Sequence, residues 1–328
     1  MKTIDFSDSD ARIFGIREPV TFPLRRLTDG IITEYPRLKD ADRRPVGARL
    51  CFRTASKHIG FEIGVENVYV DRGMSFYQAN LANCFIGSRK TARLAGIISA
   101  PNSYDDAVLS ESFENSGLND VTVYLPRNPS VTFIKIMIDD DAEILPPTPF
   151  ELAKPFVFYG SSITENGHTS SPNAYTAQVS RHFDADFYNF GFSGNACGEE
   201  PVARLIAGMD MSIFFYDYDH NAPSAEHLKN THEKFFRIIR QAKPELPIIM
   251  SSRPSNDTPD YEERKQIVRQ TYENAVAAGD RNVYFIDGAD FFGDVPVDSC
   301  VTDGTHPNDL GHYLMAQKMI SLAEKILK

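Results

Sequence analysis

Four polar segments of the chain carry residue types that could catalyse a reaction. Three of these segments lie at the end of an apolar run that is typical of a β-strand. These segments are YGSSIT (159–164), NFGFSGNA (189–196), YDYDHNAP (216–223) and VTDGTHPND (301–309). In the last of them, Asp303 and His306 are three residues apart, so the aspartate can accept a hydrogen bond from Nδ1 of the histidine. Nε2 of His306 is then free to take a proton from a serine hydroxyl, which is how a serine becomes a nucleophile.

The elements that must position these segments are apolar strands alternating with helices in the second half of the chain. We expect strands at 156–159, 187–190, 212–216, 247–252 and 283–286, and helices near 173–183, 199–209, 224–242, 259–279 and 308–327. Thr258 suits an N-cap before Pro259, Gly279 suits a helix end, and Pro307 suits the first turn of the last helix. Buried strands that are each followed by a helix predict a parallel sheet in a three-layer α/β/α domain. In such a sheet the ligand site lies beyond the carboxyl ends of the strands.

The first half of the chain has a different pattern, with short runs of alternating apolar and polar residues separated by Gly, Asn, Asp and Pro. The expected strands are 48–56, 58–65, 67–73, 75–80, 94–100, 120–126 and 130–138. This pattern predicts an all-β sandwich, similar to a jelly roll, over residues 1–150, with the catalytic domain at 151–328 and a proline-rich linker at 144–155. The segment 52–60 is either a strand with its turn or a route by which Arg53 or His58 reaches the site.

Composition excludes several classes of protein. The formal net charge of -11, without a basic stripe, argues against nucleic acid as a partner. The four cysteines are scattered singly, which predicts free thiols rather than a disulfide framework or a zinc site. No apolar run approaches the ~20 residues of a membrane helix, so no membrane partner is expected. The start, MKTIDFSDSD, is not typical of a signal peptide, and we therefore expect a cytoplasmic protein.

Taken in order, the four segments offer a serine, a glycine, an asparagine and an Asp-x-x-His pair. This order resembles the SGNH hydrolase (GDSL-like lipase/esterase) superfamily over about residues 155–325, which implies an SGNH/flavodoxin-like α/β/α domain. The resemblance implies that Ser162 is the nucleophile, His306 the general base and Asp303 the residue that orients it. It also implies an oxyanion hole made by the backbone N–H groups of Ser162 and Gly194 and the side-chain amide of Asn221.

Two blocks depart from the family pattern. The sequence has Gly160-Ser161-Ser162 in place of Gly-Asp-Ser, and we assign Ser162 because the residues after it keep the family's register. The third block usually reads Gly-x-Asn-Asp, whereas here Asn221 precedes Ala-Pro. This variant block and the β-rich front half together resemble a two-domain subgroup of GDSL-like esterases.

Three further polar residues near these blocks have open roles. His168 and Glu165 follow the predicted nucleophile closely, and they either line the substrate pocket or belong to a solvated loop. His220 either touches the substrate or supports the neighbouring Asn221.

These observations predict a serine-dependent carboxylic-ester hydrolase that acts through an acyl-enzyme and needs no cofactor or metal. Its expected partner is a small-molecule ester with a small, acetyl-like acyl group on a carbohydrate or other small alcohol; the carbohydrate is suggested by the sandwich domain alone. An acyltransferase with the same acyl-enzyme is the alternative. A metal-dependent hydrolase and a non-catalytic carbohydrate-binding protein are further hypotheses, and the oligomeric state stays open, a homo-oligomer included. Residues that could surround a cation are Asp217, Asp219, His220, Asp303 and His306.

Overall fold

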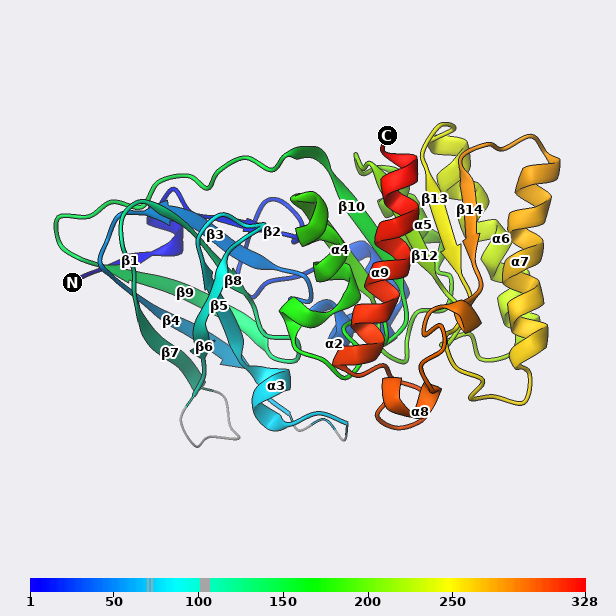
Figure 1. Ribbon diagram of the computed structural model, residues 1–328, viewed down its shortest axis with the longest axis horizontal. Coiled ribbons are helices and arrows are strands. Elements are labelled where there is room, and N and C mark those ends of the chain that lie inside the picture. Colours follow the sequence, from blue (N-terminus) through cyan, green and yellow to red (C-terminus); the bar gives the residue numbers. More distant parts are fainter. Residues whose placement is uncertain (70, 72, 101–106) are drawn as a thin grey trace.

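A computed structural model describes residues 1–69, 71, 73–100 and 107–328 of the chain. Figure 1 shows strands of a β-sandwich at one end of the molecule and a sheet flanked by helices at the other. Both parts of the predicted fold class, an all-β sandwich followed by a three-layer α/β/α domain, are therefore confirmed.

The sandwich consists of two antiparallel sheets whose apolar side chains face each other. The first sheet has the order β1 (Lys2–Asp5), β9 (Ser130–Ile138), β4 (His58–Glu66), β7 (Ala107–Glu114). The second has the order β2 (Arg12–Phe14), β3 (Arg49–Thr54), β8 (Asn119–Tyr124), β5 (Ala82–Ile86), β6 (Arg93–Ile98). Of these, β1, β2, β5 and β7 had no counterpart among the expected strands.

Two expected strands of the front half are wrong. Residues 75–80 form a helix, α3 (Phe76–Asn80), because the Ser75 hydroxyl accepts a hydrogen bond from the Gln78 amide at 3.1 Å, as a helix cap does. The strand expected at 67–73 does not extend from β4, because Asn67 has a φ of 59° and turns the chain away. Positions 70 and 72 of that expected strand lie outside the described residues.

The catalytic half has a five-stranded parallel sheet between two helical layers, as Figure 1 shows. The strand order is β11 (Ala185–Gly191), β10 (Leu152–Gly160), β12 (Ile213–Asp217), β13 (Ile248–Ser251), β14 (Val283–Ile286). Side chains at 156 and 158 pack with α4 (Tyr175–Phe183) and α9 (Asp309–Ile326). Side chains at 157 and 159 pack with α5 (Glu200–Ala207), α6 (Ala225–Ala242) and α7 (Tyr261–Ala277). The short helices are α8 (Val297–Cys300), η1 (Phe6–Asp8), η2 (Pro36–Leu38), η3 (Ser171–Asn173) and η4 (Gly288–Asp290).

The five long predicted helices are confirmed to within about two residues, but the details of three boundaries differ. The cap of α7 is Asp260, and the Thr258 hydroxyl donates to its carboxylate at 2.6 Å instead of capping the helix. Asn308 caps α9, so Pro307 lies before the helix. Pro307 instead pairs with Val301 in an isolated β-bridge. Strand β10 begins inside the expected linker 144–155. Gly279 follows the last turn of α7 with a φ of 91°, as expected of a helix end.

Part of the front half packs directly on the catalytic sheet. The helices α1 (Asp29–Glu34) and α2 (Lys39–Asp42), which the sequence reading missed, belong with Leu27 and Leu38 to the same apolar cluster as β12 and α5. A boundary between the domains at residues 150 and 151 remains a proposal.

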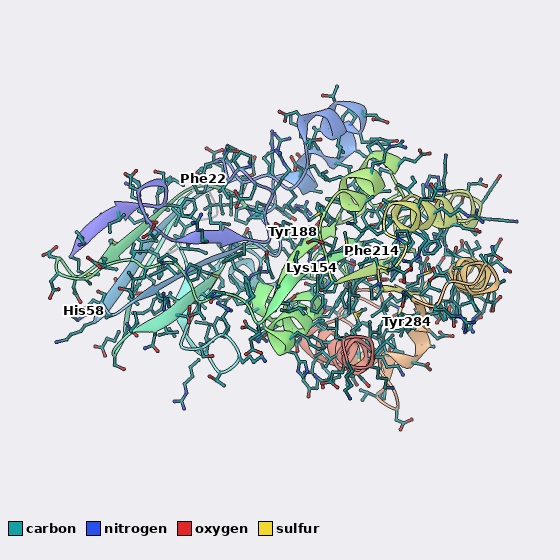
Figure 2. The ribbon with its side chains drawn as sticks, turned by 90° about the horizontal axis from the view of Figure 1, so that it is seen from above. Phe22, His58, Lys154, Tyr188, Phe214 and Tyr284 are labelled. Carbon is teal, nitrogen blue, oxygen red and sulfur yellow. The ribbon has the colours of Figure 1, made fainter. Side chains whose placement is uncertain are left out.

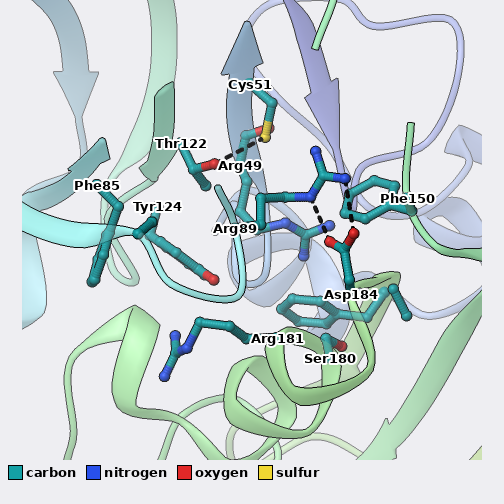
Figure 3. A pocket seen from close by; sticks show the side chains of 13 residues that line it. Arg49, Cys51, Phe85, Arg89, Thr122, Tyr124, Phe150, Ser180, Arg181 and Asp184 are labelled. Carbon is teal, nitrogen blue, oxygen red and sulfur yellow. Dashed lines mark hydrogen bonds and ion pairs between the residues drawn. The ribbon is translucent and has the colours of Figure 1, made fainter. Parts of the chain in front are cut away.

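The sandwich also contacts the α4 side of the catalytic half through ion pairs. Arg89, between β5 and β6, donates to Asp184 at the end of α4 through Nε at 2.6 Å, and Arg49 pairs with Asp186. Figure 3 shows the pocket that remains at this junction. Its volume is about 20 Å³, roughly the space of one water molecule. It is a packing gap that is too small for an ester substrate.

The outer end of the sandwich lies far from the catalytic half. In Figure 2, His58 lies at the opposite end of the molecule from Tyr284 of β14, and its ring bonds to Asp139 at 2.9 Å. Arg53 donates to the carbonyl oxygen of Pro146. Segment 52–60 is thus a strand and its turn and does not bring these side chains to the site. All four cysteines are free, as predicted. Within the described ranges, no helix is both long and apolar enough to cross a lipid bilayer.

Candidate active site

The predicted catalytic residues lie in one continuous chain of hydrogen bonds. Ser162 Oγ is 2.8 Å from His306 Nε2, and His306 Nδ1 is 2.8 Å from Asp303 Oδ2. The second carboxylate oxygen, Oδ1 of Asp303, accepts the backbone N–H groups of Thr305 at 3.1 Å and His306 at 2.8 Å. Burial raises the pKa of Asp303, but these hydrogen bonds and the histidine outweigh it and lower the pKa to about 2. The carboxylate therefore stays ionised and holds the imidazole with Nε2 toward the serine.

The two neighbouring serines point in different directions. The Ser162 hydroxyl faces His306, whereas the Ser161 hydroxyl accepts a hydrogen bond from the backbone N–H of Ile163 at 3.2 Å. Glycine is needed just before them, because a Cβ at Gly160 would lie 2.2 Å from the hydroxyl oxygen of Thr164. The geometry thus favours Ser162 over Ser161 as the reacting group.

The turn that carries Gly194 is attached to the carboxyl end of β10. The N–H of Phe192 donates to the carbonyl of Gly160 at 3.0 Å, and the N–H of Ser193 donates to the Glu165 carboxylate at 2.8 Å. Gly194 has a φ of 70°, a conformation that favours glycine, and open space surrounds the position of a Cβ there. This loop geometry suits a backbone donor, and the oxyanion role of Gly194 stays a prediction.

Buried arginines hold the loop that carries Asn221. Arg253 donates to both oxygens of Asp219, and Arg264 donates to the carbonyl oxygens of Asp219 and Ala222. Oδ1 of Asn221 is buried and has no hydrogen-bond partner among the described residues. This oxygen is a hydrogen-bond acceptor, whereas an oxyanion would bind the Nδ2 group of the amide, so the oxyanion role of Asn221 stays a prediction.

His168 lies against His306 and is not part of a solvated loop. The two rings stack with centroids 4.4 Å apart at 27°. Nε2 of His168 is 3.8 Å from Asp71 of the front half, and its buried Nδ1 has no partner among the described residues. The backbone of Gly73 touches this ring, since a Cβ there would lie 1.8 Å from it. Burial, followed by the neighbouring His306, lowers the pKa of His168.

The side chain of His220 is buried beside the Asn221 loop. Neither ring nitrogen has a hydrogen-bond partner among the described residues, and Nε2 is 3.9 Å from Asp257. Burial, with a contribution from Arg253, lowers the pKa of His220 to about 4, so the ring is neutral near pH 7. Each of these two histidines thus has a ring nitrogen without a hydrogen-bond partner among the described residues, and their role in substrate binding remains a prediction.

The residues named for a possible cation do not gather around one point. Among the described residues, a group with metal-ligand spacing is His168, Asp303 and His306. Asp217 and Asp219, which the metal hypothesis required, are not in it. Both nitrogens of His306 are already engaged, one by Ser162 and one by Asp303. A cation here would have to displace the serine hydrogen bond.

Sequence reasoning missed three residues that shape this site and left the role of a fourth, Glu165, open. Arg253 follows β13 at the carboxyl edge of the sheet, so its position after an apolar strand could have identified it. Glu165 was left with two interpretations, and it is fully buried. Asp71 and Arg127 come from the front half and bond to each other at 2.9 Å. No local signal in the sequence indicates that these two residues reach the site.

The sequence of the chain matches a known protein family. The profile of the GDSL-like Lipase/Acylhydrolase family matches residues 153–324, just over half of the chain, and the chain belongs to this family. It is accordingly an enzyme that acts on ester bonds. None of the curated proteins matches its sequence.

Solved structures share the fold across both halves. A Bacteroides ovatus protein described as a GDSL-like lipase has a TM-score of 0.86 at 23% identity, covering 99% of this chain and 98% of its own. A salicylyl-acyltransferase from a tetracycline biosynthetic pathway has a TM-score of 0.81 at 19% identity, with coverage of 100% and 99%. An acetyl xylan esterase from the rumen bacterium Butyrivibrio proteoclasticus has a TM-score of 0.64 at 12% identity, with coverage of 100% and 99%. At these identities the likeness concerns the fold alone.

Proposed function

We propose that the protein is a serine ester hydrolase in which Ser162 is the nucleophile, His306 the general base and Asp303 the residue that orients His306. The observation that carries this proposal is the pair of 2.8 Å hydrogen bonds that link Ser162 to His306 and His306 to Asp303. A serine within hydrogen-bond reach of a base, itself oriented by a third group, is the arrangement that nucleophilic catalysis requires.

The proposed reaction has two steps, the acylation and the deacylation of Ser162. Ser162 Oγ attacks the ester carbonyl while His306 Nε2 takes the hydroxyl proton, and the negative charge moves to the carbonyl oxygen. The N–H groups of Ser162 and Gly194 and the amide of Asn221 stabilise that oxygen. The intermediate collapses to an acyl-serine, and the leaving alcohol takes the proton from His306. Water then attacks the acyl-serine with His306 again as base, releasing the acid and restoring the serine.

The proposed substrate is a small acyl ester of a polar alcohol, such as a carbohydrate. His168, His220 and Asn221 each have a buried polar atom without a partner among the described residues, and such groups favour a ligand that supplies hydrogen bonds. The likeness in fold to an acetyl xylan esterase adds support for an acetylated sugar.

Acyl transfer to an alcohol is the second candidate. The observation that favours it is the full-length similarity in fold to a salicylyl-acyltransferase. Both reactions share the acyl-enzyme and differ in whether water or an alcohol receives the acyl group. Adding methanol or a sugar during turnover and measuring the ester formed separates them: mostly free acid supports hydrolysis, and mostly new ester supports transfer.

The first test follows nitrophenolate release from p-nitrophenyl acetate by the wild type, Ser162→Ala and Ser161→Ala. We expect Ser162→Ala to lose at least about 10³-fold in kcat and Ser161→Ala to stay within about threefold of the wild type, since its hydroxyl faces the backbone. A Ser162→Ala protein with full activity would refute the assignment of the nucleophile.

A further inference from the structure

Glu165 connects the loop of the predicted nucleophile to the loop of the predicted oxyanion donor. Its side chain is 0% exposed. Its backbone N–H donates to the carbonyl of Ser161 at 3.0 Å, and its carboxylate Oε2 accepts the backbone N–H of Ser193 at 2.8 Å. The next backbone N–H along the chain is that of Gly194. A single residue therefore spans the two loops that would bind the oxyanion.

The charge of this buried carboxylate is compensated by the front half of the chain. Arg44 Nη1 donates to Glu165 Oε1 at 2.5 Å, Arg26 Nη2 is 3.7 Å from Oε2, and Arg127 Nε donates to the backbone carbonyl of Glu165 at 3.2 Å. Burial alone would raise the pKa of Glu165, but Arg44, Arg127 and Arg26 outweigh it and hold the pKa below its ordinary value. The residue is thus a carboxylate, an acceptor with no proton to donate.

We propose that Glu165 is a positioning residue, which fixes the Ser193–Gly194 turn so that the Gly194 N–H points at the oxyanion, and that the front-half arginines keep it in place. This inference rests on the proposed function, in which Gly194 is a donor. An oxyanion hole works because its donors are held in advance in the geometry that the transition state needs. The N–H of Asn195 closes this turn by donating to the carbonyl of Phe192 at 2.8 Å, and the hydrogen bond from Ser193 to Glu165 ties the closed turn to the loop of Ser162.

The same loop contains a matched control in Glu199. Its side chain is also 0% exposed, it also pairs with a front-half arginine, Arg37, and it also accepts a backbone N–H of the loop, that of Cys197 at 3.0 Å. Its second oxygen accepts from the hydroxyl of Tyr159 at 2.7 Å. Glu199 thus has the same burial and type of pairing but is not bonded to the residue before Gly194.

The test compares wild type, Glu165→Gln and Glu199→Gln. An amide at 165 has one oxygen for two donors, so either Ser193 or Arg44 faces an NH₂ group. We expect Glu165→Gln to lower kcat for p-nitrophenyl acetate by about 10- to 100-fold, below the 10²–10³ that loss of a donor costs, with KM changed less than about threefold. Affinity for a trifluoromethyl ketone, which forms a tetrahedral adduct, should fall by the same factor. Glu199→Gln should keep kcat within about threefold.

Hydrogen exchange of the peptide covering 189–198, measured by mass spectrometry, gives a readout that does not need activity. Faster exchange in Glu165→Gln than in Glu199→Gln supports the positioning role even if the wild type hydrolyses no ester, an outcome that would refute the proposed function alone. Unchanged exchange, a kcat within threefold of wild type, or an equal loss in both variants would overturn the inference. If Glu165→Gln does not fold, Arg44→Met replaces it and is judged by the same criteria.

Discussion

The two sides of the candidate site hold their buried carboxylates in different ways. On the side toward the sandwich, Glu165 faces three arginines of the front half, and its pKa is lowered. On the sheet side, Asp217 accepts hydrogen bonds from the hydroxyls of Thr164 at 3.0 Å and Tyr175 at 3.3 Å. Burial, the largest influence, raises the pKa of Asp217 to about 7. Among the described residues, Asp217 thus has no arginine partner like those of Glu165, whereas Asp219, two residues further on, is paired with Arg253 of its own half.

The two halves of the chain contribute different residues to the candidate site. The serine, histidine and aspartate of the predicted triad all come from the catalytic half, on or beside the carboxyl ends of its strands and before α9. In the described part of the chain, the front half contributes residues that pack against the site, such as Arg44 on Glu165 and Asp71 beside His168. Variants in the catalytic half should therefore affect turnover most, and variants in the front half should affect stability and geometry.

The largest effect is expected from His306→Ala. Removing the only group bonded to the Ser162 hydroxyl among the described residues leaves the serine without a base, so kcat for p-nitrophenyl acetate should fall by about 10⁴-fold or more. His182→Ala is the control, because His182 is exposed and bonds only to Glu324 in the described structure. A kcat of His306→Ala within tenfold of the wild-type value would contradict the assignment of the catalytic residues to this half of the chain.

A smaller effect, on stability, is expected from Arg127→Met. Arg127 is 2% exposed and bonds to Asp71 and to the backbone of Glu165. Its loss leaves buried acceptors unpaired, and the free energy of unfolding in urea should fall by about 3 kcal/mol, at the low end for a broken buried ion pair because Asp71 is partly exposed. Arg204→Met, in an exposed pair with Glu200, should change it by less than about 1 kcal/mol. Equal effects would mean that the junction contributes no more than the surface.

A further effect concerns how stability depends on pH. Between its ordinary value of 3.8 and about 7, Asp217 is deprotonated in the unfolded chain but protonated in the folded one, so its burial lowers stability as pH rises through that window. Asp217→Asn keeps the shape of the protonated acid and does not titrate. Its Tm relative to wild type should therefore rise by roughly 3–6 °C from pH 4 to pH 8. Thermal unfolding across that range measures this, and a constant difference in Tm would show that Asp217 is not protonated.

Much of the catalytic half could be predicted because its signals are local. Apolar strands followed by polar residues predicted the sheet and the segments at its carboxyl edge, and the family resemblance then assigned roles to Ser162, Asp303 and His306. The interpretation of the third block around Asn221 rested on the family resemblance, and the structure shows a loop held by Arg253 and Arg264.

The rest could not be predicted because it depends on pairs that are far apart in sequence. Arg44 and Glu165 are 121 residues apart, and Arg26 donates to the backbone of Gly191 across 165 residues. A buried Glu and a solvated Glu look the same in a loop sequence, so only the fold decides which one Glu165 is. In the front half, short strands with weak alternation left β1, β2, β5 and β7 undetected, and Ser75 turned an expected strand into a helix.

The central claim is that Ser162 is a nucleophile activated by His306, and covalent labelling with a fluorophosphonate probe tests it most directly. Peptide mass spectrometry of the labelled protein should find one adduct, on Ser162, that persists in Ser161→Ala and forms far more slowly in His306→Ala. An adduct on Ser161 or on another residue, or equally fast labelling of Ser162 without His306, would contradict the account.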